Sequence, residues 1–405
     1  MQLDLFGSTR AIAWQEGKAA FLFATEGCWS ELPHLYGRYG TTATAKLIER
    51  LKAIEKAQSV LVCDSGMQAT ALSFDVLMAP RAHAVLMRQI YNKTRTYAHW
   101  LAERLAGSVT IVDDGEPPAL AAAIRHETRF VFAETFTNPL VRAQDIHGLV
   151  AAVRTGRQIA PDLKLIIDST IATPWAFTTP LLAQGVDIVI ASGTKAMSGT
   201  DRDLWGYIAT CDTPFANAAM DLMAMRGGIL DWRRALAILE RFDSADAAHA
   251  RRSITATEVA KFLASHPKVS EVFHPCLPSH PDAAVVAQQY LRHGSIVSFR
   301  VAGATEEETR HYADVLATCV IVRYALSFDG LATKVNHHKT VSEYFTPDDA
   351  LRRNGFDRLI RLAVGMEDAE DLMAVLNWAL HHAPSVGTDD VARWQADRIA
   401  ELGVS

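Results

Sequence analysis

The 405-residue chain lacks closely spaced pairs of cysteines. Its five cysteines are odd in number, scattered and free of CxxC spacing, which argues against a disulfide framework and against a zinc site. We therefore expect no metal and a reducing, cytoplasmic setting. The cysteines are Cys28, Cys63, Cys211, Cys276 and Cys319.

Long apolar runs and basic clusters are also missing. No apolar run approaches the roughly 20 residues of a membrane span, and the first ten residues lack the pattern of a secretion signal. The net charge of -6, without a long basic run, disfavours nucleic acid or an anionic membrane as partner. A nucleotide-binding oxidoreductase is disfavoured because no GxGxxG follows a first strand. The content of 49% hydrophobic and 21% charged residues instead indicates a soluble globular protein.

Short apolar runs alternate with amphipathic stretches between residues 56 and 225. This alternation predicts an α/β domain with a mostly parallel sheet and helices on both faces. Ligands of such sheets bind beyond the carboxyl ends of the strands. The predicted strands cover residues 59–63, 84–87, 109–112, 129–133, 163–167, 186–191 and 206–209.

The pattern changes beyond residue 226. A long helix over 232–266 bridges to a smaller α+β domain, with strands at 294–301, 320–325 and 359–364 and helices at 306–317 and 369–382. A peripheral helix is expected after residue 384. We thus predict three parts: an N-terminal arm (1–50), a ligand-binding domain (51–235) and a C-terminal α+β domain (236–405).

Lys195 follows the predicted strand 186–191, in Ser192-Gly193-Thr194-Lys195. Desolvation at the end of a buried strand lowers the pKa of a lysine amine, which is the condition for forming a Schiff base. The hydroxyls of Ser192 and Thr194 can donate hydrogen bonds to a phosphate. A plain surface lysine after a strand is the alternative.

Two other strand ends carry candidate ligand groups. Ser65-Gly66-Met67 opens a helix, where free N–H groups form an anion site, although Ser65 also suits an ordinary N-cap. Asp168 ends the strand 163–167, where its carboxylate either faces a ring nitrogen or caps the next turn.

Three further segments are ambiguous on their residues alone. Glu134 and Asn138 end the strand 129–133, with Asn138 before a proline. Tyr91 follows the strand 84–87 and either stacks on a flat ligand or belongs to the core or rim. Tyr36 and Arg38 lie in a glycine-rich loop that either reaches a phosphate or forms a surface turn.

The small domain offers a carboxylate site. Alternation along the strand 359–364 places Arg361 on the face opposite Ile360 and Leu362. An arginine in so apolar a strand needs a partner, either a substrate carboxylate or a structural ion pair. Ser327 follows the strand 320–325.

In order along the chain, from Tyr36 to about Leu380, these segments resemble the Cys/Met-metabolism family of pyridoxal-phosphate enzymes. This family includes cystathionine γ-synthases, cystathionine lyases, methionine γ-lyases and O-acylhomoserine sulfhydrylases. The resemblance implies the fold-type-I transferase fold and pyridoxal 5'-phosphate (PLP) as cofactor. It also implies a homotetramer or dimer with shared active sites, in which the arm (1–50) contacts a neighbouring subunit.

The resemblance assigns a role to each candidate. Lys195, Tyr91 and Asp168 would be catalytic: the lysine bonds the cofactor, the tyrosine lies over its ring and the aspartate pairs with its ring nitrogen. Ser327 and Arg361 would bind the substrate carboxylate. The cofactor-binding set would be Tyr36, Arg38, Ser65, Gly66, Met67, Tyr91, Glu134, Asn138, Asp168, Ser192, Thr194 and Lys195.

Several positions depart from the family pattern, and they cluster where a substrate side chain would lie. Leu326 stands where cystathionine-using members tend to carry a glutamate. The other departures are Lys93, Ala196, the segment Gly199-Thr200-Asp201-Arg202-Asp203, and Phe328-Asp329 after Ser327.

The resemblance predicts PLP-dependent elimination or replacement at the γ- or β-carbon of a sulfur-containing or other γ-substituted amino acid. A methionine or canavanine-type γ-lyase and a cystathionine γ-synthase-like enzyme both fit. O-acylhomoserine sulfhydrylase and cystathionine β-lyase are the alternatives within the family. A catalytically silent PLP-binding protein is the alternative outside it.

Overall fold

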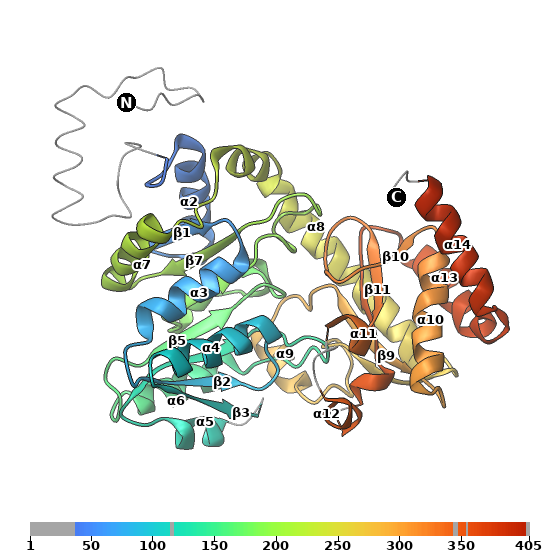
Figure 1. Ribbon diagram of the computed structural model, residues 1–405, viewed down its shortest axis with the longest axis horizontal. Coiled ribbons are helices and arrows are strands. Elements are labelled where there is room, and N and C mark those ends of the chain that lie inside the picture. Colours follow the sequence, from blue (N-terminus) through green and yellow to red (C-terminus); the bar gives the residue numbers. More distant parts are fainter. Residues whose placement is uncertain (1–36, 114–116, 343–346, 354, 402–405) are drawn as a thin grey trace.

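The computed structural model describes residues 37–113, 117–342, 347–353 and 355–401. It has a larger and a smaller domain, each built on one sheet, with the long helix α8 (Trp232–Ser265) running between them (Figure 1). Among these residues no helix has both the length and the apolar character needed to cross a membrane.

The sheet of the larger domain has the strand order β1-β7-β6-β5-β4-β2-β3 within the described residues. β2 to β6 run parallel, whereas β7 is antiparallel to both of its neighbours. The strands are β1 (Ser59–Cys63), β2 (His83–Met87), β3 (Ser108–Val112), β4 (Thr128–Glu134), β5 (Lys164–Asp168), β6 (Ile188–Ala191) and β7 (Gly206–Thr210).

Helices cover both faces of this sheet. In the sheet, β3 lies at the edge beside β2, and β4 lies on the other side of β2. The connections from β2 to β3 and from β3 to β4 therefore cross the sheet in opposite directions, and right-handed crossovers place their helices on opposite faces. Accordingly α3 packs with α4 and α7, and α5 packs with α6. The helices are α2 (Thr42–Glu55), α3 (Gly66–Leu77), α4 (Asn92–Arg104), α5 (Pro117–Ala123), α6 (Ile146–Gly156) and α7 (Thr213–Arg226).

The smaller domain is an antiparallel sheet with one parallel edge pair, in the order β10-β11-β12-β9-β8. Its strands are β8 (Val269–Phe273), β9 (Ile296–Val301), β10 (Val322–Tyr324), β11 (Thr333–His337) and β12 (Ile360–Ala363). Its helices are α10 (Glu306–Thr318), α11 (His338–Ser342), α12 (Asp348–Arg353), α13 (Ala369–His382) and α14 (Thr388–Glu401), whereas α9 (Ala283–Gln289) packs against the core of the larger domain.

The two faces of the small sheet differ in polarity. Val335, Leu362 and Val297 pair across β11, β12 and β9 and belong to the core beneath α10 and α13. The adjacent row of paired residues, Asn336, Arg361 and Ser298, points to the other face. Ser298 there donates to the carbonyl of Pro139, so the polar face lies against the larger domain.

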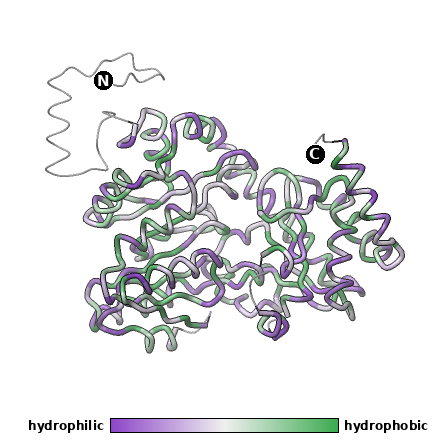
Figure 2. Tube along the Cα trace, in the orientation of Figure 1, coloured by the Kyte–Doolittle hydropathy of each residue, from purple (hydrophilic) through white to green (hydrophobic). Residues whose placement is uncertain are grey.

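Helix α8 contributes to both hydrophobic cores. Ala235, Ile238 and Phe242 belong to the core of the larger domain, and Val259 and Leu263 belong to that of the smaller one. Figure 2 shows hydrophobic and hydrophilic residues alternating along the chain. The core therefore changes within α8, whereas the sequence-based boundary was placed at residue 235. Residues 42–50 of the predicted arm form the start of α2, and residues 1–36 lie outside the described residues.

The predicted strands and helices are present, with ends displaced by one or two residues. Two strands were missed, β8 and β11. In the β11 sequence Thr-Lys-Val-Asn-His four of the five residues are polar, so the strand gives little apolar signal. The peripheral helix expected in the tail is α14.

A buried carboxyl group joins α2 to β7. The hydroxyl of Tyr207 donates to Oε1 of Glu55 at 2.5 Å, and Glu55 is 1% exposed. Burial raises the pKa of Glu55 to about 7. The folded protein therefore keeps this proton at a pH where the unfolded chain has lost it.

We predict that the free energy of unfolding falls by up to about 3 kcal/mol as pH rises from 4.5 through 7, because ionising Glu55 in the core is unfavourable. Glu55→Gln keeps a partner for Tyr207 and should lack this part of the pH dependence. Urea unfolding of both proteins at pH 5 and pH 8 measures the difference. Equal pH dependence in the two proteins would contradict the assignment.

Candidate active site

Lys195 lies beyond the end of β6, in the segment 192–203 that we call the lysine loop. Its Nζ donates a hydrogen bond to Oγ of Ser327 over 2.8 Å. Ser327 belongs to the segment after β10, residues 326–330, which we call the Ser327 turn. Burial lowers the pKa of the Lys195 amine, which favours its neutral, nucleophilic form.

Arg361 is 2% exposed and reaches the same turn from β12. Its guanidinium donates to the carbonyls of Leu326 (2.8 Å) and Ser327 (3.1 Å). It also donates to Oδ1 of Asn138 over 3.3 Å. Burial lowers the pKa of Arg361 to about 10, so it stays cationic at neutral pH. Within the described residues all these acceptors are uncharged, and its Nε has no acceptor.

The ring of Phe328 lies beside both cations. Its centroid is 5.1 Å from Nζ of Lys195 and 5.9 Å from Cζ of Arg361. An aromatic face attracts cations at this distance. Lys195, Arg361 and Ser327, predicted separately from three segments, are thus brought together around one turn.

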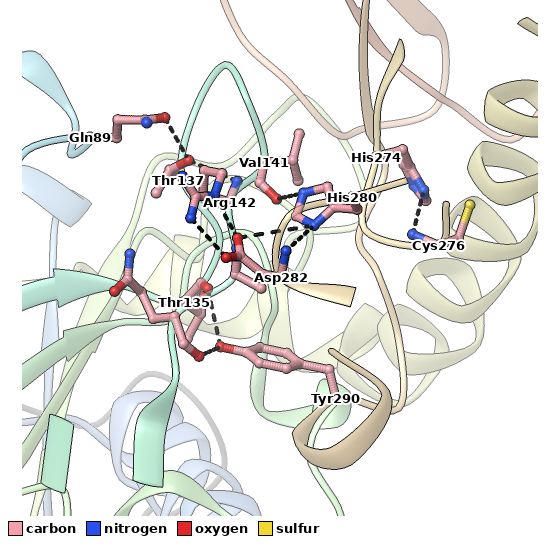
Figure 3. Close-up of polar contacts among 12 residues, drawn as sticks. Gln89, Thr135, Thr137, Val141, Arg142, His274, Cys276, His280, Asp282 and Tyr290 are labelled. Atoms are coloured by element: carbon pink, nitrogen blue, oxygen red, sulfur yellow. Dashed lines mark hydrogen bonds and ion pairs between the residues drawn. The ribbon is translucent and has the colours of Figure 1, made fainter. Parts of the chain in front are cut away.

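The loop that carries Asn138 is fixed by a buried network (Figure 3). Arg142 pairs with both carboxylate oxygens of Asp282, at 2.6 and 2.8 Å, and Ala143 N–H donates to the same carboxylate. The hydroxyl of Tyr290 lies 2.7 Å from the carbonyl of Gln144. The Asn138–Pro139 peptide is cis. Asn138 is therefore held in place from the larger domain while it contacts Arg361.

The start of α3 lies directly against the lysine loop. A methyl group added at Gly66 would lie 2.5 Å from Cβ of Ser192, so only glycine permits this approach. Ser65 caps α3 by accepting from Gln68 N–H at 3.2 Å. The first N–H groups of a helix have no partner within it, and here they adjoin the hydroxyl of Ser192. This arrangement suits a phosphate.

The hydroxyl of Thr194, predicted to bind a phosphate, contacts the backbone of Trp205 in this structure. It donates to the carbonyl of Trp205 at 3.1 Å and accepts from the N–H of Trp205 at 3.0 Å. A hydroxyl has one proton, so a bond from Thr194 to a phosphate requires the bond to Trp205 to break.

Asp168 ends β5, next to β6 in the sheet. Its Oδ1 accepts from the N–H of Thr170 at 2.8 Å, and its carbonyl accepts from the N–H of Thr135. Desolvation raises the pKa of Asp168 to about 6. The carboxyl is therefore ionised at neutral pH and gains from a cationic partner such as a protonated ring nitrogen.

Glu134 and Tyr91 contact each other at the carboxyl ends of β4 and β2. The N–H of Tyr91 donates to Oε1 of Glu134 at 2.5 Å, and the Tyr91 side chain is 52% exposed. Met67 contacts the next helix, since its Sδ lies 4.0 Å from Oγ1 of Thr94. Arg38 precedes α2, with its guanidinium 5.9 Å from the ring of Tyr39. Tyr36 lies outside the described residues.

A buried amine, a carboxylate and a helix start thus meet at the carboxyl ends of parallel strands. They define an α/β enzyme of the pyridoxal-phosphate type. A model of the Cys/Met metabolism PLP-dependent enzymes matches residues 18–381, and the chain belongs to this family. The predicted family, fold, cofactor and enzyme class are confirmed.

Relatives with known roles support this placement. Cystathionine gamma-synthase 1 of Arabidopsis thaliana is 32% identical over 85% of this chain, which spans only 60% of that plant protein. L-methionine gamma-lyase of Fusobacterium nucleatum is 26% identical, over 93% of this chain and 94% of its own length. The solved cystathionine gamma lyase of Micromonospora echinospora superposes with a TM-score of 0.79 at 28% identity, covering 86% of this chain and 89% of that one.

The residues present fit PLP. Lys195 offers the amine, Asp168 the carboxylate, and the α3 start with Ser192 the phosphate site. Sequence reasoning did not find Arg252 and Lys334, whose contacts with the lysine loop and the Ser327 turn are described below. Lys334 lies on the missed strand β11, and Arg252 lies inside α8, where an arginine resembles any surface charge.

We predict that Asp168→Asn weakens PLP binding at least about tenfold, because a charge-assisted hydrogen bond contributes about 1.5–3 kcal/mol. In the wild type, affinity should fall as pH drops through about 6, where the carboxyl gains a proton. The variant should lack this decrease. Equilibrium dialysis against PLP between pH 5 and pH 8 measures both effects, and unchanged affinity of the variant at pH 8 would refute the role.

Proposed function

We propose that the protein catalyses PLP-dependent elimination or replacement at the γ- or β-carbon of an amino acid. The observation that carries the proposal is that Lys195 and Arg361 both bind Ser327. The Lys195 amine lies 2.8 Å from the Ser327 hydroxyl, and the Arg361 guanidinium donates to the Ser327 carbonyl. One small molecule could therefore contact both the nucleophilic amine of Lys195 and the buried guanidinium of Arg361, whose own acceptors are uncharged. An amino acid supplies the matching groups, since its carboxylate pairs with Arg361 while its α-carbon lies near Lys195.

Each side chain has a distinct task in this reaction. When bound, PLP withdraws electrons from the substrate α-carbon. Nζ of Lys195 moves the α-proton, and the carboxylate of Asp168 holds the proton of the ring nitrogen. The start of α3 and Ser192 bind the phosphate. Tyr91 assists proton transfer to the leaving group, and Glu134 and Asn138 flank the ring.

The substrate is proposed to be a γ-substituted, sulfur-containing amino acid or a close analogue. Relatives named for cystathionine synthesis and for methionine cleavage both support this class. Leu326, 71% exposed beside Ser327, favours an uncharged substrate end over cystathionine. O-acylhomoserine sulfhydrylase and cystathionine β-lyase remain the alternatives, with canavanine as a further lyase substrate.

We also propose a cytoplasmic homotetramer or dimer with shared sites. The family pattern at Tyr36 and Arg38 supports this assembly, because it places the pair at the phosphate of a neighbouring copy. Light scattering of the purified protein distinguishes dimer, tetramer and monomer, and a monomer with full activity would refute shared sites.

We predict that Lys195→Ala abolishes both turnover and the visible absorbance of bound PLP. Exposed Lys261 on α8 provides the matched control, and Lys261→Ala should keep both. The assay is a panel of methionine, cystathionine, canavanine and O-acylhomoserine, with and without an added thiol. Release of 2-oxo acid and ammonia indicates a lyase, and activity only with the thiol indicates a transferase. Bound PLP without turnover on any substrate would indicate the silent binding protein.

We predict that Arg361→Lys raises KM roughly tenfold or more with a smaller change in kcat. A single ammonium cannot hold the turn carbonyls and a substrate carboxylate together as the planar guanidinium does. Arg323→Lys, at an exposed position on β10, is the control. An unchanged KM would show that the carboxylate binds elsewhere.

A further inference from the structure

Two segments that depart from the family pattern contact each other behind Lys195. They are the stretch around Asp201 in the lysine loop and Asp329-Gly330 in the Ser327 turn. Gly330 has φ +105°, and a methyl group there would collide with the carboxylate of Asp201. Asp329 is buried and also has positive φ (+59°), so the turn has a conformation that side chains rarely adopt.

Lys334 connects these two segments from β11. Its Nζ donates to Oδ1 of Asp201 at 2.5 Å and to the backbone carbonyl of Asp329. The residue is 7% exposed. It lies on the polar face of the small sheet, two residues before Asn336, the cross-strand neighbour of Arg361.

Arg252 makes the same connection from α8. It is fully buried and donates to the carbonyls of Ala196 in the lysine loop and Gly330 in the Ser327 turn, both at 3.2 Å. Its Nε lies 3.9 Å from Oδ1 of Asp329, which also accepts a hydrogen bond from Ser295. Asp201, Arg252, Asp329 and Lys334 form one unit, which we call the ionic cluster.

Resting on the proposed function, we propose that Lys334 and Arg252 are positioning residues for the reaction. They hold the lysine loop against the Ser327 turn and so fix the Lys195 amine beside Ser327 and Arg361. Neither touches the reacting atoms.

The balance of charges in the ionic cluster favours this role over recognition of a charged substrate. Two carboxylates face two cations, and the hydrogen bonds of Lys334 and Arg252 given above all end on protein atoms. The Asp201 side chain is half-exposed, but Lys334 is buried, so losing Asp201 would leave a buried amine without this carboxylate partner.

Three charges of the cluster, together with Arg361, act on the Lys195 amine in opposing directions. Asp329 of the Ser327 turn and Asp201 of the lysine loop raise the pKa of its amine. Arg361 on β12 and Lys334 on β11 lower it. Removing a cation should therefore raise the pKa of the Lys195 amine, and removing an anion should lower it. Residues that only stabilised the fold would not produce shifts of opposite sign.

The test compares Lys334→Met, Asp201→Asn and the double variant with the wild-type chain, all full-length and freed of cofactor. Amine labelling at Lys195 is followed by peptide mass spectrometry from pH 6 to pH 11. The midpoint should rise by roughly one pH unit in Lys334→Met and fall by a similar amount in Asp201→Asn. The double variant should lie close to the wild type. Shifts of the same sign, or none, would overturn the proposal.

Lys339→Met is the matched control, because Lys339 also forms ion pairs, with Glu306 and Asp348, outside the cluster. It should leave the Lys195 midpoint unchanged. If Lys334→Met does not fold, the fall of the Lys195 labelling midpoint in Asp201→Asn still tests the proposal. In the cofactor-loaded enzyme, Lys334→Met should lower kcat with little change in KM.

The labelling needs neither PLP nor turnover, so it separates the two proposals. A chain that binds no PLP but shows the opposite shifts would refute the proposed function and leave the cluster's action on Lys195 intact. A chain that turns over normally without those shifts would refute the positioning role alone.

Discussion

The hydrogen bond from Nζ of Lys195 to Oγ of Ser327 joins the two domains at the candidate active site. The lysine belongs to the larger sheet, which also supplies Asp168 and the start of α3. The serine belongs to the smaller domain, whose sheet supplies Arg361. Each domain alone therefore holds half of the apparatus. In the proposed function these are the cofactor half and the carboxylate half, and they become one site only because the turn after β10 reaches the end of β6.

Buried cations have two different environments in this protein. Arg252 and Lys334 have carboxylate partners, so their charges are compensated by the chain itself. Arg361 is equally buried, yet its hydrogen-bond acceptors in the described structure are an amide and two backbone carbonyls. Neutral acceptors fix the direction of a guanidinium without cancelling its charge. This difference separates an arginine that stabilises the fold from one that is ready for an anionic ligand.

The elements of the larger domain could be predicted because each buried parallel strand is a short apolar run followed by a turn. Lys195, Asp168 and Ser65 could be placed for the same reason, since strand ends and helix starts are visible in sequence. The β11 strand could not, because its alternating polar residues face the larger domain rather than water. The bond between Thr194 and Trp205, 11 residues apart, depends on the path of the lysine loop, which no local pattern encodes.

The ionic cluster was hidden for a related reason. Asp201 and Asp329 depart from the family pattern, but they lie 128 residues apart in sequence and are connected by the buried Lys334. Long-range charge pairing has no periodicity, so only the folded arrangement shows that one lysine binds both segments.

Helix α8, 34 residues long and about 50 Å from end to end at 1.5 Å per residue, packs its first half into one core and its second half into the other. Unfolding of either domain would expose the apolar residues of α8 that pack in its core, and the loss of helix could extend into the half that packs in the other domain. We therefore expect the two domains to unfold together, and cutting the chain within α8 would remove part of the helix that packs against each core.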